Sequence, residues 1–193
     1  MSNTENQNSL EAFPINKLLV KFSVPSIIAM LVTALYNIVD QFFIGQAVGS
    51  LGNAATSISF PLSITCIAIA LLFGIGGASA FNLSMGAGDK KTAAYYIGNA
   101  AAMLFLGGFV LCIISEIFLK PMLLFFGSSK SVLPYAMTYT RITAIGFPML
   151  ILTAGGGHLI RADGSPNMSM ICNLIGAVIN TVLDAIFVFG MNM

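Results

Sequence analysis

Residues 41–88 read QFFIGQAVGSLGNAATSISFPLSITCIAIALLFGIGGASAFNLSMGAG, and no side chain in this stretch carries a formal charge. One membrane-spanning helix needs about 20 predominantly apolar residues. The stretch therefore has room for the end of one spanning helix, a turn and a second spanning helix. The whole chain agrees, because only 8% of its 193 residues are charged and 57% are hydrophobic. Soluble domains are about 25% charged, so the composition predicts a polytopic membrane protein.

Five apolar segments of spanning length lie along the chain, and turn-forming sequences separate them. The segments are residues 18–44, 54–85, 93–119, 132–154 and 168–188. The turns are GQAVGSLGN (45–53), GAGDKK (86–91), FGSSKS (126–131) and RADGSPN (161–167). We therefore predict an all-α bundle of membrane helices. The second segment is longer than a bilayer requires, which predicts that it tilts or protrudes.

Basic residues are distributed unequally between the two sides of this predicted bundle. Five fall on the side of the N-terminus and two on the other: Lys17, Lys21, Lys90, Lys91 and Arg161 against Lys120 and Lys130. Cytoplasmic loops carry the excess of Lys and Arg, so we predict a multi-pass protein of the cell membrane with a cytoplasmic N-terminus. Residues 1–17 form a polar tail without the features of a signal peptide. The net charge of +1 gives no reason to expect a nucleic-acid partner.

Two carboxylates fall inside the predicted spans at matching depth. Asp40 lies in the first segment and Asp184 in the fifth, each past the midpoint toward the outer face by roughly 8–12 Å. An acid in mid-membrane costs about 2.5–3.5 kcal/mol on insertion scales. Polar residues share the faces of these two acids: Tyr36, Asn37, Asn173 and Asn180. Such a pair of acids points to a functional site.

We predict that the first and fifth spans face each other across a cavity. Asp40, Asn180 and Asp184 would bind a cation there, and Tyr36, Asn37 and Asn173 would line the cavity. Carboxylate and amide oxygens suit a hard cation such as sodium. Two nearby carboxyl groups in a low dielectric suit a proton equally well. The alternative is that these polar side chains only hold helices together by hydrogen bonds, and for Asn37 and Asn173 it is at least as well supported.

Three further polar residues receive structural interpretations. Glu116 lies near the outer end of the third segment and is interpreted as an interfacial residue. Arg141, in the fourth segment, either lies near the outer surface or pairs with an acid. His158, the only histidine, follows three glycines near the inner end of that segment, and a proton-relay role has little support.

Small residues and prolines predict where the helices approach and bend. Gly74 with Ala78, and Gly76 with Ala80, have the four-residue spacing that lets a second helix approach closely. Pro25, Pro61 and Pro148 fall inside predicted spans, where neighbouring groups must satisfy the freed carbonyls. These features allow bending, although static bundles contain them too.

Several longer stretches together resemble the MATE family of multidrug and toxic compound extrusion transporters, closest to its prokaryotic DinF-like branch. They are FSVPSIIAMLVTALYNIVDQFFIGQAVG, GGASAFNLSMGAGDKKTAAYYIGNA, YTRITAIGFP and LIRADGSPNMSMICNLIGAVINTVLDAIFVFG. The resemblance runs from about residue 18 to residue 190. It implies a fold of twelve helices in two lobes. Residues 18–193 would then supply the first five helices of the amino-terminal lobe, without the sixth helix or the second lobe.

The resemblance also implies an activity and a site. Family members exchange drugs and other cationic or amphipathic compounds for sodium ions or protons, and they use no cofactor. Their coupling-ion residues correspond to Asp40, Asn180 and Asp184, with Tyr36 beside them. The expected partners are drug-like molecules, membrane lipid and the missing carboxy-terminal lobe. The fragment alone is expected to be inactive.

Two other functions were weighed against the antiporter. A flippase for lipid-linked precursors would need several basic residues for a pyrophosphate group, whereas the spans offer only Arg141 at depth. A non-transporting membrane subunit that assembles with a second lobe is the other alternative. An enzyme is not expected, because the sequence contains no Ser/His/Asp set, zinc-ligand spacing or phosphate-binding glycine loop.

Overall fold

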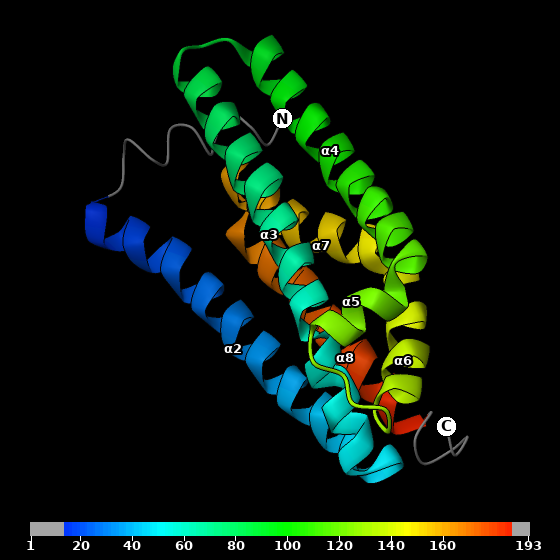
Figure 1. The fold of residues 1–193 in the computed structure, drawn as a ribbon. Helices are drawn as coiled ribbons and strands as arrows, with labels where there is room; N and C mark the ends of the chain where they lie inside the picture. Colours follow the sequence, from blue (N-terminus) through cyan, green and yellow to red (C-terminus); the bar gives the residue numbers. More distant parts are fainter. Residues whose placement is uncertain (1–13, 187–193) are drawn as a thin grey trace.

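The computed structural model describes residues 14–186, with only the backbone described for Tyr36, Asp184 and Ala185. Over these residues the chain folds into helices joined by short turns (Figure 1). The helices are α2 (Ile15–Val48), α3 (Ser50–Gly86), α4 (Lys90–Ile117), α5 (Leu119–Phe125), α6 (Leu133–Ile145), α7 (Phe147–Ala162) and α8 (Pro166–Ala185). The predicted all-α class is confirmed.

Four of these helices are long and apolar enough to cross a membrane, and a fifth span is formed if α6 and α7 are taken together. The number of spans predicted from the sequence is therefore matched, although the bounds differ. The first helix begins at Ile15, inside the predicted tail, and α7 continues to Ala162 instead of ending at residue 154. The predicted end of the fifth span at residue 188 lies outside the described residues. The short helix α5 was not predicted.

The fourth predicted span is bent by 57° between α6 and α7. The bend falls at Gly146, and Pro148 lies in the first turn of α7 instead of in the middle of a helix. A proline is tolerated there because the first N–H groups of a helix have no partner within it. Prolines 25 and 61 do lie inside α2 and α3, as predicted.

The turn between α2 and α3 is much shorter than its sequence indicated. Only Gly49 separates the two helices, and its φ of 73° lies in the left-handed region that glycine adopts without strain. The remainder of the predicted turn at residues 45–53 is helical. The glycine, serine and asparagine residues therefore predicted the position of the turn correctly, but the predicted turn was too long.

The start of α4 is fixed by a side-chain cap. Asp89 accepts hydrogen bonds from the Thr92 backbone N–H (3.0 Å) and from the Thr92 hydroxyl (2.6 Å). These two bonds hold the pKa of the Asp89 carboxyl below its usual value. The cap therefore stabilises α4 at neutral pH, and its contribution is lost as the pH falls through that lowered pKa.

The main core lies where α3, α4 and α7 pack against one another. Its buried side chains include Leu62, Cys66, Ala70, Leu104 and Ile151. A second, smaller core joins α3 to α5 and α6 through Ala55, Leu119, Leu123, Val132 and Ala136. In Figure 1, α3 and α4 form a long hairpin at the top of the view, while α2 lies to one side. Helix α2 contacts α8 and α3.

Glycines set the closest approach in the main core. A Cβ atom on Gly74 would lie 2.7 Å from the backbone oxygen of Gly155, and one on Gly108 would lie 2.5 Å from the Cα of Pro148. Gly155 in turn faces the side chain of Leu104. The predicted close approach at Gly74 is confirmed. The prediction at Gly76 is wrong for contacts within the described chain, because a Cβ there would meet nothing within 4 Å.

A buried hydrogen bond connects the two cores. The hydroxyls of Ser59 on α3 and Thr140 on α6 lie 2.6 Å apart, and the two residues are only 3% and 1% exposed. Ser59 also donates to the backbone oxygen of Ala55 at 2.9 Å, so Thr140 is the donor in the shared bond if both are formed at once. The pair therefore ties α6 to α3 at a site that water does not reach.

We expect a measurable coupling between these two hydroxyls. In a double-mutant cycle of Ser59→Ala and Thr140→Val, the interaction energy should be about 1 kcal/mol, because each single variant leaves a buried hydroxyl with one partner fewer. The free energy of unfolding in a denaturing detergent titration measures it. Strictly additive single effects would show that the short contact contributes nothing.

Candidate functional site

Asp40 is half-buried in the second half of α2. Its neighbours Leu35, Ile38 and Phe42 are exposed, while Phe43 and Ile44 are half-buried. Residues three and four apart share a face of a helix, so positions 40, 43 and 44 form the side of α2 that is turned toward the rest of the bundle. The carboxylate therefore lies on the inward side of a helix whose other side is apolar.

Helix α8 contacts α2, which agrees with the prediction that the first and fifth spans face each other. Asn173 on α8 is half-buried and Asn180 is exposed. Position 184 belongs to the last turn of α8, one turn beyond Asn180, but the Asp184 side chain lies outside the described residues. The structure thus brings together the two helices of the predicted cation site and leaves its ligand set of Asp40, Asn180 and Asp184 as a prediction.

The structure adds Tyr139 of α6 to the surroundings of Asp40. The two residues interact electrostatically, and the Tyr139 side chain is half-buried. Sequence reasoning missed this residue, because no spacing within residues 132–154 indicates which face of α6 is turned toward α2. An aromatic hydroxyl in the middle of a span was the only available signal.

Of the two polar residues predicted beside Asp40 on α2, the structure describes the side chain of only one. Asn37 is exposed, and its amide donates to the backbone oxygen of Thr33 at 2.8 Å. This local bond occupies one donor and leaves the amide oxygen as an acceptor. The side chain of Tyr36 lies outside the described residues. Neither observation tests whether these residues line a cavity.

Helix α2 is also tied to α3 by polar groups one residue beyond Asp40. The hydroxyl of Thr56 lies 3.1 Å from the Gln41 side-chain oxygen and 2.9 Å from the backbone oxygen of Asn53. The Asn53 side-chain oxygen is buried without a hydrogen-bond partner among the described groups. These contacts fix the second half of α2, and hence Asp40, relative to the bundle.

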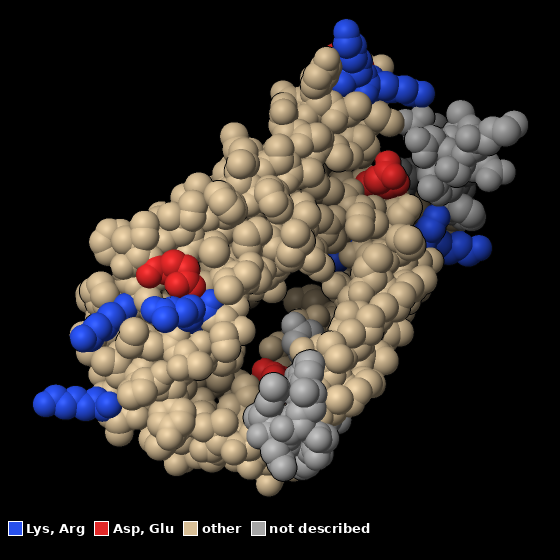
Figure 2. Space-filling model, turned by 90° about the vertical axis from the view of Figure 1, so that its right-hand side faces the viewer, with Lys and Arg blue, Asp and Glu red and all other residues tan. Residues whose placement is uncertain are grey.

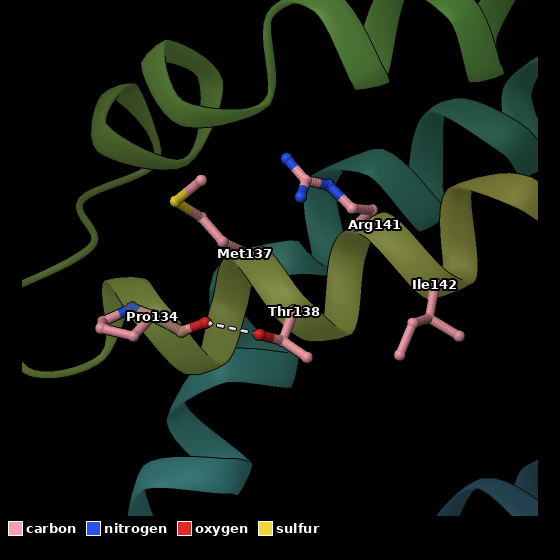
Figure 3. A pocket seen from close by; sticks show the side chains of 5 residues that line it. All are labelled: Pro134, Met137, Thr138, Arg141 and Ile142. Atoms are coloured by element: carbon pink, nitrogen blue, oxygen red, sulfur yellow. Dashed lines mark hydrogen bonds between the residues drawn. The ribbon is translucent and has the colours of Figure 1, made fainter.

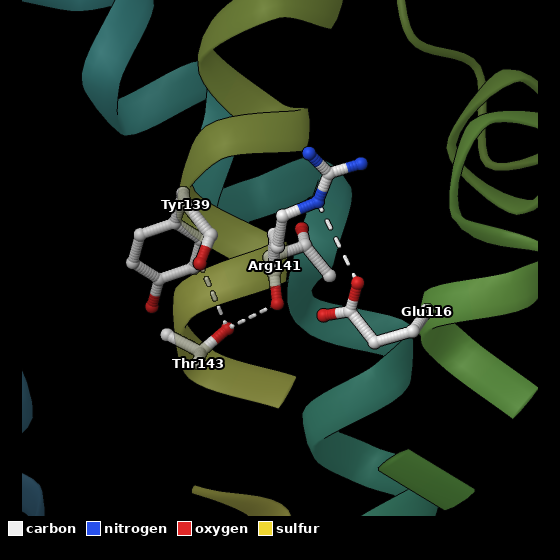
Figure 4. Close-up of polar contacts among 5 residues, drawn as sticks. Glu116, Tyr139, Arg141 and Thr143 are labelled. Carbon is white, nitrogen blue, oxygen red and sulfur yellow. Dashed lines mark hydrogen bonds and ion pairs between the residues drawn. The ribbon is translucent and has the colours of Figure 1, made fainter. Parts of the chain in front are cut away.

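Arg141 pairs with Glu116 and not with an acid of the predicted cation site. Its Nε lies 3.5 Å from Oε2 of Glu116, which is near the end of α4. Figure 4 shows Arg141 and Tyr139 projecting from opposite sides of α6, while Thr143 lies beside Tyr139. The Thr143 hydroxyl contacts the backbone oxygens of Tyr139 and Thr140 at 3.1 and 3.2 Å. Of the two interpretations of Arg141, pairing with an acid is therefore observed.

A separate polar cluster joins the end of α7 to α8. Arg161 donates to the Ser169 hydroxyl at 3.1 Å and lies 3.1 Å from Nδ1 of His158. The Ser169 hydroxyl is 3.2 Å from the backbone oxygen of Gly157, on which it can act as donor. Through these bonds His158 is part of a helix-to-helix contact, which supports its structural interpretation.

Residues that could form a multi-ligand metal centre do not cluster in the part of the chain that the structure describes. No group of three or more His, Cys, Asp or Glu side chains is found there. Because the side chain of Asp184 is not among the residues searched, the predicted sodium ligands are not tested by this observation.

Comparison with known proteins assigns the fold to a family. The sequence model of the MatE family matches residues 25–186 of this chain. The chain belongs to the MatE family. It is 26% identical over 187 residues to the FAD transporter of Shewanella oneidensis, covering 97% of this chain and 41% of that protein. It is 29% identical over 183 residues to the multidrug export protein MepA of Staphylococcus haemolyticus, covering 95% and 40%.

A solved structure of a MatE-type transporter superposes well on this chain. The outward-facing conformation of a multidrug resistance MATE family transporter gives a TM-score of 0.83 at 26% identity, covering 90% of this chain and 38% of the other. The chain therefore spans about two fifths of the length of the relatives it matches. Those relatives are named as transporters or export proteins, which fits a membrane transport protein and not an enzyme.

Proposed function

We propose that this MatE chain forms helices of the amino-terminal lobe of a secondary antiporter. The complete protein exports drugs or other cationic or amphipathic compounds in exchange for sodium ions or protons. The observation that carries this proposal is the half-buried Asp40 on the inward side of α2, a helix that contacts α8, together with its electrostatic interaction with Tyr139. A carboxylate kept in an apolar span needs a compensating role, and cation binding supplies one.

The proposed site suits coupling because its residues come from separate elements. Asp40 comes from α2, Tyr139 from α6 and Asn180 from α8. A cation that binds between helices stabilises the arrangement in which they are closest, and a cation can shift a conformational equilibrium only by its difference in affinity for the two states. Binding and release at this site would therefore bias the lobe between two shapes.

The relatives support the substrate class. Multidrug export proteins from staphylococci align with nearly the whole chain. The exposed surface of the chain is rich in apolar side chains, and in the complete transporter part of that surface would line the cavity between the lobes. Because the chain covers about 40% of these relatives, the substrate would be bound with contributions from helices beyond this chain.

A direct test is dye efflux from proteoliposomes that contain the complete transporter. Ethidium should leave the vesicles when an opposing sodium or proton gradient is applied, and the gradient that suffices identifies the coupling ion. Proteoliposomes with the 193-residue chain alone are the control and should remain inactive. Efflux that needs no ion gradient would contradict the antiporter, and full activity of the chain alone would contradict the two-lobe arrangement.

The FAD transporter relative favours a second candidate substrate. FAD carries a pyrophosphate, so its recognition needs basic groups, and this MatE chain aligns with that transporter over 97% of its length. The same proteoliposomes loaded with FAD distinguish the two candidates. Retention of FAD together with gradient-driven ethidium efflux supports a drug exporter, whereas the reverse pattern supports an exporter of anionic dinucleotides.

A further inference from the structure

A hollow of about 370 Å³ opens on the surface of α6. It is lined by Pro134, Met137, Thr138, Arg141 and Ile142 (Figure 3). All five residues belong to α6, on the side of that helix opposite to the buried Ala136, Thr140 and Ala144. Tyr139, which interacts electrostatically with Asp40, projects from a different side of α6 than Arg141 of the hollow.

The guanidinium of Arg141 is only partly engaged by the protein. Its Nε faces Glu116 at 3.5 Å, but its two terminal nitrogens have no hydrogen-bond partner among the described residues, and the side chain is 62% exposed. Glu116 is 33% exposed, and its second oxygen is buried without a partner in the same part of the chain. The acid is thus held in the bundle, while the forked end of the arginine remains open to a second anion.

The charge around the hollow favours an anion. Lys120 lies on α5, which contacts both α4 and α6, and Lys130 lies in the turn before α6. Figure 2 shows basic side chains beside an acidic group at one end of the molecule, and a second set of charged side chains at the other end. Residues 116–141 contain three basic side chains and one acidic side chain, so this part of the chain has an excess of positive charge.

The rest of the lining suits hydrocarbon. Pro134, Met137 and Ile142 are apolar, and the Thr138 hydroxyl already donates to the backbone oxygen of Pro134 at 3.1 Å. A matching ligand has an anionic head and an apolar body. Arg141 lies eight residues after the first residue of α6, about 12 Å along the helix, and a long arginine side chain can extend from that depth to the headgroup region.

We propose that this hollow is a binding site for an anionic phospholipid. The terminal nitrogens of Arg141 bind the lipid phosphate as a bidentate pair, and an acyl chain lies over Pro134, Met137 and Ile142. Glu116 orients the arginine through Nε without neutralising its forked end. The site is distinct from the transport site and does not depend on the proposed coupling ion or on the exported compound.

The test is native mass spectrometry of the purified chain, titrated with phosphatidylglycerol or phosphatidylcholine. Wild type should bind phosphatidylglycerol about tenfold more tightly than phosphatidylcholine, and Arg141→Gln should lose this preference. Arg141→Lys should retain only part of it, because an ammonium group cannot form the bidentate pair. Equal preference in wild type and Arg141→Gln would overturn the proposal.

Two further variants separate phosphate binding from loss of the ion pair. Glu116→Gln removes the competing negative charge but keeps a side-chain oxygen that can accept from Arg141 Nε, so it should bind phosphatidylglycerol at least as tightly as wild type. Lys130→Gln removes a positive charge that does not line the hollow and should change the affinity much less than Arg141→Gln. Weakened binding in Glu116→Gln, or an equal loss in Lys130→Gln, would show that the hollow does not hold the phosphate.

Inorganic phosphate distinguishes a lipid from a free anion. If the acyl chain contributes to binding, millimolar phosphate should not displace phosphatidylglycerol, and Ile142→Ala should weaken lipid binding. Displacement by phosphate alone, with Ile142→Ala indistinguishable from wild type, would overturn the lipid as the occupant. The thermal midpoint of each variant confirms that it is folded before its affinity is interpreted.

Discussion

Gly74→Val is expected to destabilise the chain more than any other single change considered for its core. A Cβ atom at position 74 would lie 2.7 Å from the backbone oxygen of Gly155 and 2.8 Å from its Cα. These are backbone atoms, so they cannot rotate away as the end of a flexible side chain would. Helices α3 and α7 would have to separate, and overpacking of this kind costs about 1–3 kcal/mol or more. We expect a loss of at least about 3 kcal/mol, since the separation would also open the contacts with α4.

The matched control is Gly76→Val, which introduces the same residue two positions along the same helix. A Cβ there would meet nothing within 4 Å, so the change in unfolding free energy should stay within about 1 kcal/mol. Thermal melting followed by size-exclusion chromatography measures both variants under the same conditions. Similar losses for the two variants would mean that valine disturbs α3 itself and that the close approach to α7 is not what stabilises the bundle.

Composition and hydropathy predicted the helices well, because each spanning helix must satisfy its own backbone groups in the membrane. The roles of individual glycines were predicted less well. The fourth apolar segment was predicted to end at residue 154, just before the run Gly155–Gly157, yet α7 continues to Ala162. Gly155 is buried where α3 and α4 approach α7, so it serves packing and not a turn.

The bend at Gly146 and the short helix α5 could not be predicted for a related reason. Local sequence places Pro148 within an apolar run, but whether a proline kinks a helix or begins a new one depends on the helices around it. Here α4 packs against the start of α7, where a Cβ on Gly108 would lie 2.5 Å from the Cα of Pro148. Such contacts join residues far apart in the sequence, and spacing along the chain does not contain them.

The sequence predicted the part of the candidate site in which a residue type is energetically unfavourable in a membrane. Asp40 stood out because a carboxylate in an apolar helix is expensive, and its helix does contact the helix of Asn180. Tyr139 was missed because a tyrosine in a span carries no such cost. The sequence did not determine the partner of Arg141, because the contact with Glu116 depends on how α4 and α6 are placed relative to each other. This is the same reason that the bend was not predicted.

Asp40→Asn is expected to remove cation coupling from the complete transporter. Asparagine keeps the size and one oxygen of the aspartate, but it has no negative charge and cannot take up a proton in the working range of pH. A proton-coupled exporter should therefore lose gradient-driven efflux altogether. A sodium-coupled exporter should bind sodium at least about tenfold more weakly, since an interaction with a charged group contributes about 1.5–3 kcal/mol.

Binding of radioactive sodium to the purified chain measures the loss of sodium affinity. Gradient-driven efflux by the complete transporter measures the loss of coupling. The matched control is Asp163→Asn, which removes the same charge from an exposed position at the end of α7 and should leave both properties unchanged. Tyr139→Phe keeps the ring and removes the hydroxyl beside Asp40, so it should weaken coupling less than Asp40→Asn does. If Asp40→Asn folds normally and retains gradient-driven efflux, the carboxylate serves only to hold α2 in the bundle. The coupling ion would then bind at Asp184 without Asp40, or among helices that this chain does not contain.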